Sequence, residues 1–80
     1  MARLKNYDKA FVHAIGRRLM TLRKEHGLLQ REVAEKSGVC LATINQSESG
    51  QVMPSVFTLA KLAKVYETTI DNIINNKQNE

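Results

Sequence analysis

Apolar residues recur along this chain at spacings of three and four, which is the period of an amphipathic helix. Near the start, five of them share one helix face or lie beside it: Val12, Ile15, Leu19, Leu22 and Phe11. The pattern predicts a first helix that Asn6 or Asp8 caps and that ends before Gly27. Gly16 lies inside this helix, where glycine costs up to about 1 kcal/mol relative to alanine. We therefore expect close packing at that position.

Two short helices are predicted in the middle of the chain. Glycines at positions 38 and 50 end them, which gives the spans 30–37 and 41–49. Their inward residues are expected to be Val33, Ala34 and Ile44.

The last third of the chain predicts two more helices. Ser55 follows Pro54 and is a good N-cap, so a fourth helix is expected to begin there. Its inward residues are expected to be Val56, Leu59, Leu62, Ala63 and Tyr66. Phe57 is expected on its outward side. A fifth helix is expected to begin at Thr69, and residues 75–80 are expected to fray.

No segment of four or more residues alternates with period 2, so no sheet is predicted. The length of 80 residues allows one domain. The prediction is a single all-α domain over residues 1–80, a compact five-helix arrangement.

Composition narrows the class of protein. Twelve Lys and Arg against eight Asp and Glu give a net charge of +4, which is modest evidence for an anionic partner. One cysteine cannot form an internal disulfide, which favours a reducing compartment such as the cytoplasm. Residues 1–10 are polar and predict no signal peptide. No stretch approaches 18 apolar residues, so no membrane partner is expected.

Candidate catalytic and metal sites are lacking in the sequence pattern. No Ser or Cys has a His in a plausible triad, and no carboxylate pair stands in a cleft-forming context. His13 and His26 point about 220° apart on one helix, so they cannot share a metal. We expect no enzyme activity, no cofactor and no metal.

The informative stretch is 30–50. Its two short helices are joined by a turn over residues 37–40, where Gly38 supplies a left-handed conformation and Val39 can fill the corner. This is a helix-turn-helix arrangement, in which the second helix projects into a DNA major groove.

Further residues at matching spacings extend this pattern to roughly residues 15–74. They are Leu22-Arg23, Gly27-Leu28, Gln30, Val33-Ala34, Gly38-Val39, Ile44, Glu48, Gly50, Pro54-Ser55, Thr58-Leu59, Leu62-Ala63, Ile70-Asp71 and Ile73-Ile74. With them the chain resembles the Cro/repressor-type helix-turn-helix domain, the XRE family. The resemblance implies a five-helix all-α fold and sequence-specific binding to double-stranded DNA, usually as a symmetric homodimer.

The resemblance also implies residue roles. The groove-facing positions of helix 41–49 match Leu41, Ala42, Asn45 and Gln46. Asn and Gln can each grip adenine, while Leu and Ala can touch thymine methyls. Expected backbone contacts are Gln30, which matches a family phosphate ligand, and Thr43. Arg31 and Lys61 are added because these basic residues lie near a helix terminus or the expected path of the DNA backbone. For Thr43 a local helix contact is the alternative, and for each basic residue the alternative is a solvated surface charge.

Two further sets of residues complete the implied site. Arg23 and Glu48 match a family pair that forms a largely buried ion pair between the first and third helices. Ile70, Ile73 and Ile74 are expected to supply a dimer interface, with one or two of them filling the core. A core-only role is the alternative.

The chain departs from the family pattern at four positions. Leu29 stands where a Ser or Thr cap is usual, Cys40 replaces Ser or Thr, Ser47 replaces a large apolar residue, and Glu67 replaces a frequent Gly. We interpret Cys40 as a small stand-in for Ser, with a redox switch as the alternative. Helix 41–49 has no Arg or Lys, which predicts readout that favours A·T base pairs.

The leading hypothesis is a dimeric transcriptional regulator, such as a repressor, that reads a palindromic operator. The alternative is an antitoxin-like or adaptor module whose main partner is another protein. Phe57 keeps this alternative open as a possible partner contact.

Overall fold

The computed structural model describes residues 6–75, and all regular secondary structure in that range is helical. In chain order the helices are α1 (Asn6–Glu25), α2 (Gln30–Ser37), α3 (Leu41–Ser49), α4 (Val56–Val65) and α5 (Ile70–Asn75). The predicted five-helix, all-α fold is confirmed. Residues 76–80, predicted to fray, and the side chains of the two predicted caps of α1, Asn6 and Asp8, lie outside the part that can be described.

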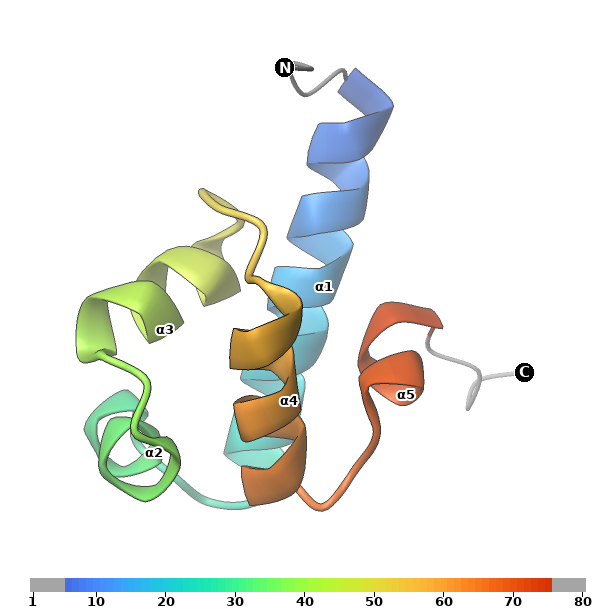
Figure 1. Ribbon diagram of the computed structural model, residues 1–80. Helices are drawn as coiled ribbons and strands as arrows, with labels where there is room; N and C mark the ends of the chain where they lie inside the picture. The colour runs from blue at the N-terminus through green and yellow to red at the C-terminus, as the bar shows by residue number, and fades with distance from the viewer. Residues whose placement is uncertain (1–5, 76–80) are drawn as a thin grey trace.

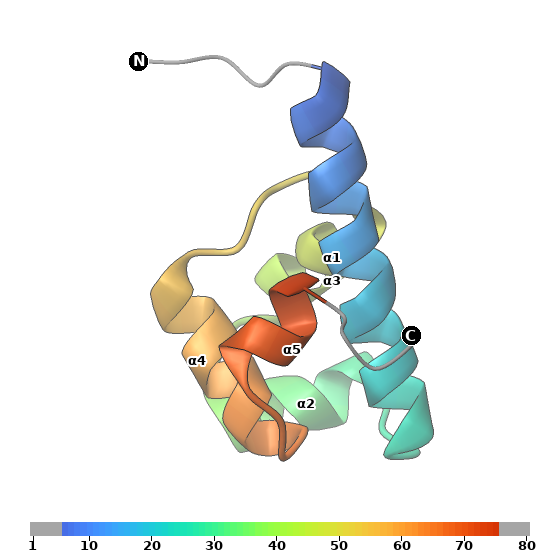
Figure 2. The ribbon, with the colours of Figure 1, turned by 90° about the vertical axis from the view of Figure 1, so that its right-hand side faces the viewer.

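Helix α1 is the longest element, and the other helices gather around it (Figures 1 and 2). In Figure 1, α2 and α3 lie on one side of α1 and α5 on the other, with α4 between them. Every helix contributes to one core. Its fully buried apolar side chains are Ile15, Leu19, Val33, Ile44, Leu59, Leu62 and Ile73. The spacing of three and four residues therefore identified the inward faces of α1, α2 and α3 correctly.

The helix starts follow local capping chemistry. Ser55 caps α4 by accepting a hydrogen bond at 3.1 Å from the backbone N–H of Thr58. Thr69 caps α5 in the same way, accepting at 3.1 Å from the backbone N–H of the third residue of that helix. Leu29 has no such side chain, but the Glu32 carboxylate accepts from the Leu29 backbone N–H at 2.8 Å. One of the two bonds of a capping box thus remains at α2.

Helices α1 and α3 approach each other closely at Gly16. A Cβ atom at this position would lie 2.4 Å from the carbonyl oxygen of Ser47 and 2.7 Å from that of Glu48. The close packing predicted from this glycine is confirmed. Ser47 itself is fully buried, and its hydroxyl oxygen has no hydrogen-bond partner in the structure.

The turn after α4 contains a residue type that is unusual for its backbone conformation. Glu67 has a φ of 56°. Its N–H bonds to the carbonyl of Lys64 and the next N–H bonds to Ala63, as in a Schellman ending. Gly27 and Gly50 occupy the same position after α1 and α3. The departure noted at position 67 is therefore a non-glycine residue in a left-handed conformation.

One prediction about an apolar residue is wrong. Val56, expected in the core, is 71% exposed, because it is the first residue of α4 and Leu59 is the first of that helix to reach the core. Of the three isoleucines expected to divide between the core and a dimer contact, Ile73 is fully buried and fills the core, so it is not available to a second copy. Ile70 and Ile74 are half-buried against the same core. Phe57 is 69% exposed, as predicted.

The helices of residues 6–75 include none whose length and apolar character would let it cross a bilayer.

Candidate nucleic-acid interface

A tight turn connects α2 to α3 and sets the direction in which α3 projects. Gly38 has a φ of 79° and its N–H bonds to the Ala34 carbonyl at 2.9 Å. The Val39 N–H then donates to the Ser37 hydroxyl at 3.0 Å, and the Val39 side chain is buried in the core. The corner is thus fixed both by backbone hydrogen bonds and by a buried side chain.

Helix α3 divides into an inward and an outward face. Ile44, Ser47 and Glu48 are buried. The outward face comprises the exposed residues Leu41, Ala42, Asn45, Gln46 and Ser49. All four residues predicted to contact bases therefore lie on the solvent side of α3. Their contact with DNA remains a prediction.

A bidentate ion pair ties α3 to α1. Arg23 Nε donates to Glu48 Oε2 at 2.7 Å, and Arg23 Nη2 donates to Glu48 Oε1 at 2.9 Å. The side chains are 13% and 3% exposed, so water screens the pair weakly. Arg23 Nη1 also donates to the Leu28 carbonyl, at 3.0 Å. The hydrogen bond with Glu48 raises the pKa of Arg23. The pair implied by the family resemblance is thus present and holds α3 in place.

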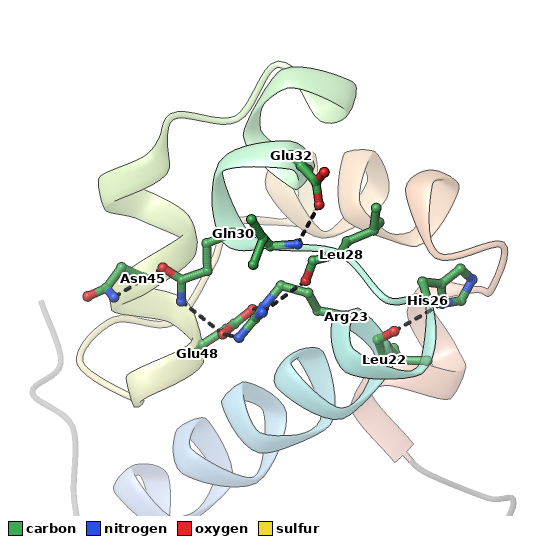
Figure 3. Close-up of polar contacts among 9 residues, drawn as sticks. Leu22, Arg23, His26, Leu28, Gln30, Glu32, Asn45 and Glu48 are labelled. Carbon is green, nitrogen blue, oxygen red and sulfur yellow. Dashed lines mark hydrogen bonds and ion pairs between the residues drawn. The ribbon is translucent and has the colours of Figure 1, made fainter.

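The side chain of Gln30, at the start of α2, extends this network to the surface. Its Nε2 donates to Glu48 Oε1 at 3.0 Å, and its Oε1 accepts from Asn45 Nδ2 at 3.3 Å (Figure 3). Sequence reasoning assigned Gln30 only to a phosphate. Its link to Asn45 depends on how α2 and α3 pack, and no sequence signal indicated it.

Thr43 and Cys40 contact each other at the start of α3. The Cys40 Sγ lies 3.2 Å from the Thr43 Oγ1. This hydrogen bond lowers the pKa of the exposed Cys40 thiol, and backbone N–H groups at the helix start act in the same direction. Of the two alternatives for Thr43, the structure contains the local helix contact.

The basic residues predicted to lie on the DNA backbone have different surroundings. Arg31 is exposed on α2. Lys61 is half-buried, and its ammonium lies 4.2 Å from the centre of the Phe57 ring, within cation–π range. Lys61 also lines an open hollow of about 490 Å³, whose other lining residues are Lys36, Ser37, Lys64 and Val65.

Four large apolar side chains are exposed within a six-residue stretch around Pro54. They are Val52, Met53, Val56 and Phe57, with exposed fractions of 37%, 39%, 71% and 69%. Sequence reasoning flagged only Phe57. The other three lie in a loop or in the first turn of a helix, where helical spacing gives little information about burial.

The two histidines have different neighbours. The His13 ring lies beside Gly50 at the end of α3, where an added Cβ would come within 2.5 Å of its Nδ1. His26 is exposed at the end of α1, with its ring 5.7 Å from that of Tyr66. Among residues 6–75, no cluster of three His, Cys, Asp or Glu side chains is suited to a metal ion.

Helices α2 and α3 are joined by a tight left-handed turn. The ion pair with α1 holds the buried side of α3, and the outer face of α3 is exposed. This arrangement defines a helix-turn-helix domain. Comparison with protein families agrees: residues 19–73 match the helix-turn-helix family HTH_3. The chain belongs to this family.

Two regulators are similar in sequence. The HTH-type transcriptional regulator PuuR of Escherichia coli K12 is 37% identical over 65 residues, which are 81% of this chain and 35% of PuuR. The HTH-type transcriptional regulator SinR of Bacillus licheniformis is 34% identical over 64 residues, which are 79% of this chain and 58% of SinR. The chain thus spans about a third of one relative and somewhat over half of the other.

Two solved structures share the fold. The restriction-modification controller protein C.AhdI from Aeromonas hydrophila has a TM-score of 0.77 and 30% identity, covering 80% of this chain and 97% of its own. An HTH_3 family transcriptional regulator from Vibrio cholerae has a TM-score of 0.79 and 33% identity, covering 88% of this chain and 39% of its own.

Proposed function

We propose that this chain is a cytoplasmic, sequence-specific DNA-binding transcriptional regulator whose helix α3 enters the major groove. The observation that carries the proposal is the arrangement of α3. Its buried side is fixed to α1 by the Arg23–Glu48 ion pair, and its exposed side presents the carboxamides Asn45 and Gln46 beside Leu41 and Ala42. The relatives named as transcriptional regulators and the controller protein support this role.

The expected readout follows from the chemistry of the exposed face. Carboxamides pair with the acceptor and donor of adenine, and apolar side chains contact the thymine methyl group. Because α3 carries no Lys or Arg, the bidentate contact of Arg with guanine is not available from this helix. Half-sites rich in A·T pairs are therefore expected.

A homodimer bound to a palindromic operator completes the proposal. Two recognition helices would then lie about 34 Å apart, one turn of DNA. Ile70 and Ile74, half-buried on the short helix α5, are the remaining candidates for the contact between copies. Arg31 and Lys61 are candidates for phosphate contacts, together with Gln30.

A second candidate function is binding of a protein partner. It is favoured by the exposed apolar residues Val52, Met53, Val56 and Phe57. A contiguous apolar patch of roughly several hundred Å² on a monomer usually marks a site of interaction. A variant with Val56→Ser and Phe57→Ser that retains full DNA affinity and its oligomeric state, but loses a co-purifying protein, would support this candidate.

The test of the main proposal is binding of the purified chain to duplexes at several salt concentrations. A specific duplex should bind at least about a thousandfold more tightly than an unrelated one of equal length. Asn45→Ala and Gln46→Ala should reduce this ratio, and Arg31→Ala should weaken binding to all duplexes alike and reduce the salt slope by about 1. Equal affinity for every duplex would contradict the proposal.

A further inference from the structure

Four side chains from three helices and one loop carbonyl form a continuous hydrogen-bonded chain behind and across α3. It runs from the Leu28 carbonyl through Arg23, Glu48 and Gln30 to Asn45, with the distances given above (Figure 3). Burial decreases along it, from a Glu48 side chain that is 3% exposed to Asn45 in contact with solvent. A buried charge is thus linked to a surface residue of the proposed DNA-reading face.

The direction of each hydrogen bond in this chain is fixed by the carboxylate. An ionised Glu48 can only accept, so the Gln30 amide must turn its NH₂ group toward Glu48. The Gln30 oxygen then faces Asn45, which must turn its own NH₂ group toward Gln30. The usual ambiguity between the two ends of an amide is removed here, because reversing either amide would bring two oxygens together.

Asn45 is left with one N–H and its Oδ1 for a ligand. The Oδ1 lies on the side away from Gln30 in Figure 3. One donor and one acceptor match the major-groove edge of adenine, which offers the N7 acceptor and the N6 donor. Guanine offers two acceptors, N7 and O6, and would place O6 against the Asn45 oxygen.

We infer that Gln30, held by Glu48, is a specificity-determining positioning residue that fixes the Asn45 amide in the orientation that accepts adenine and rejects guanine. The inference rests on the proposed function, because it requires α3 to read bases. It gives Glu48 a second role beyond joining α1 to α3. It also gives Gln30 a role that a phosphate contact alone would not produce.

The experiment measures relative affinities for duplexes that differ at single base pairs. Asn45→Ala first identifies the base pair that Asn45 reads, as the position where base preference is lost. Gln30→Met then removes the carboxamide at nearly constant side-chain length. At the base pair that Asn45 reads, the preference for adenine over guanine should fall by about tenfold, as expected when one oriented pair of hydrogen bonds to a base is lost. Preferences at all other positions should remain within about twofold of the parent.

Arg31→Ala is the matched control, because Arg31 is the exposed neighbour of Gln30 on α2. It should weaken all duplexes alike. The coupling between Gln30 and position 45 is tested with Asn45→Asp, which turns an oxygen toward Gln30 instead of an NH₂ group. If Gln30 orients position 45, this carboxylate should lower adenine preference at this position in the parent background more than in the Gln30→Met background.

A measurement on the free protein tests the hydrogen bond without DNA. The Asn45 side-chain proton that bonds to Gln30 should exchange with water more slowly in the parent than in Gln30→Met, while the other proton should change little. Unchanged exchange, or an adenine preference that Gln30→Met leaves intact, overturns the inference while the regulator function stands. A parent protein that prefers no base at any position overturns the inference and the proposed function together.

Discussion

Replacing Gly16 with alanine is expected to destabilise the protein, although alanine is the better helix former. Alanine at a helix-interior position gains about 1 kcal/mol over glycine from backbone propensity. Against this, the added Cβ would lie 2.4 Å and 2.7 Å from two carbonyl oxygens of α3, where ordinary contact begins at 3.4 Å. Both are backbone atoms, so relief requires a shift of about 1 Å between α1 and α3.

That shift would disturb the core residues on the two helices, Ile15, Leu19 and Ile44, which are at most 1% exposed. Overpacking of a core typically costs about 1–3 kcal/mol, and the clash with two backbone atoms places this case at the upper end. After the gain in propensity, we expect a net loss of about 2 kcal/mol. For a domain of this size the melting temperature should fall by roughly 8–16 °C.

The assay is urea and thermal unfolding followed by circular dichroism. Ala14→Gly is the matched control, because Ala14 is exposed on the same helix and the reverse exchange there measures the propensity difference alone, about 1 kcal/mol. If Gly16→Ala instead raises stability by the amount that Ala14→Gly loses, α1 and α3 do not approach as closely as described.

Four further predictions concern stability. Arg23→Met and Glu48→Leu should each lower the free energy of unfolding by about 3–5 kcal/mol, because each leaves a buried charge without its partner. The double variant should lose at least about 1 kcal/mol less than the sum of the two single losses, and strict additivity would contradict the role of the ion pair. Ser47→Ala should raise the free energy of unfolding by about 1 kcal/mol, because it removes a buried hydroxyl without a partner, and any loss in urea titration would count against that. Glu67→Gly should raise the free energy of unfolding by about 0.5–1 kcal/mol, since glycine adopts a φ of 56° without strain. Glu67→Ala should have little effect, and equal behaviour of the two variants would refute this explanation. Burial raises the pKa of Tyr66 to about 12, whereas the tyrosine of the unfolded chain titrates near 10 and therefore loses its proton first. The free energy of unfolding should fall between pH 10 and 12, by up to about 1.4 kcal/mol per pH unit. Tyr66→Phe should remove this part of the fall.

Helix positions were predictable because local signals agree along this chain. Gly38, Gly50 and Ser55 place the ends of three helices, and the spans predicted for α2 and α3 match the structure residue for residue. Apolar spacing in α1 gave the correct inward face, because a helix of 20 residues shows the period several times.

Short helices gave too little pattern to assign faces. With six residues, α5 presents three isoleucines that satisfy the same spacing, and only packing decides that Ile73 is the one fully buried. The first turn of α4 poses the same problem for Val56. A residue near a helix end follows the helical period without reaching the core.

Side-chain contacts between helices were predictable only where the family resemblance supplied them. Arg23 and Glu48 are 25 positions apart, and nothing in their spacing indicates contact. The Gln30–Asn45 hydrogen bond had no such precedent in the sequence reasoning. It arises from the crossing of α2 and α3, which no local pattern encodes.

The central claim is that α3 reads DNA sequence, and selection from a random duplex library at moderate salt, followed by sequencing, tests it most directly. The proposal predicts an enriched palindrome with A·T-rich half-sites about one helical turn apart. Asn45→Ala should abolish the enrichment at one position in each half-site. A parent protein that enriches no sequence, and shows only background binding that weakens with salt, would contradict the claim and favour a protein partner instead.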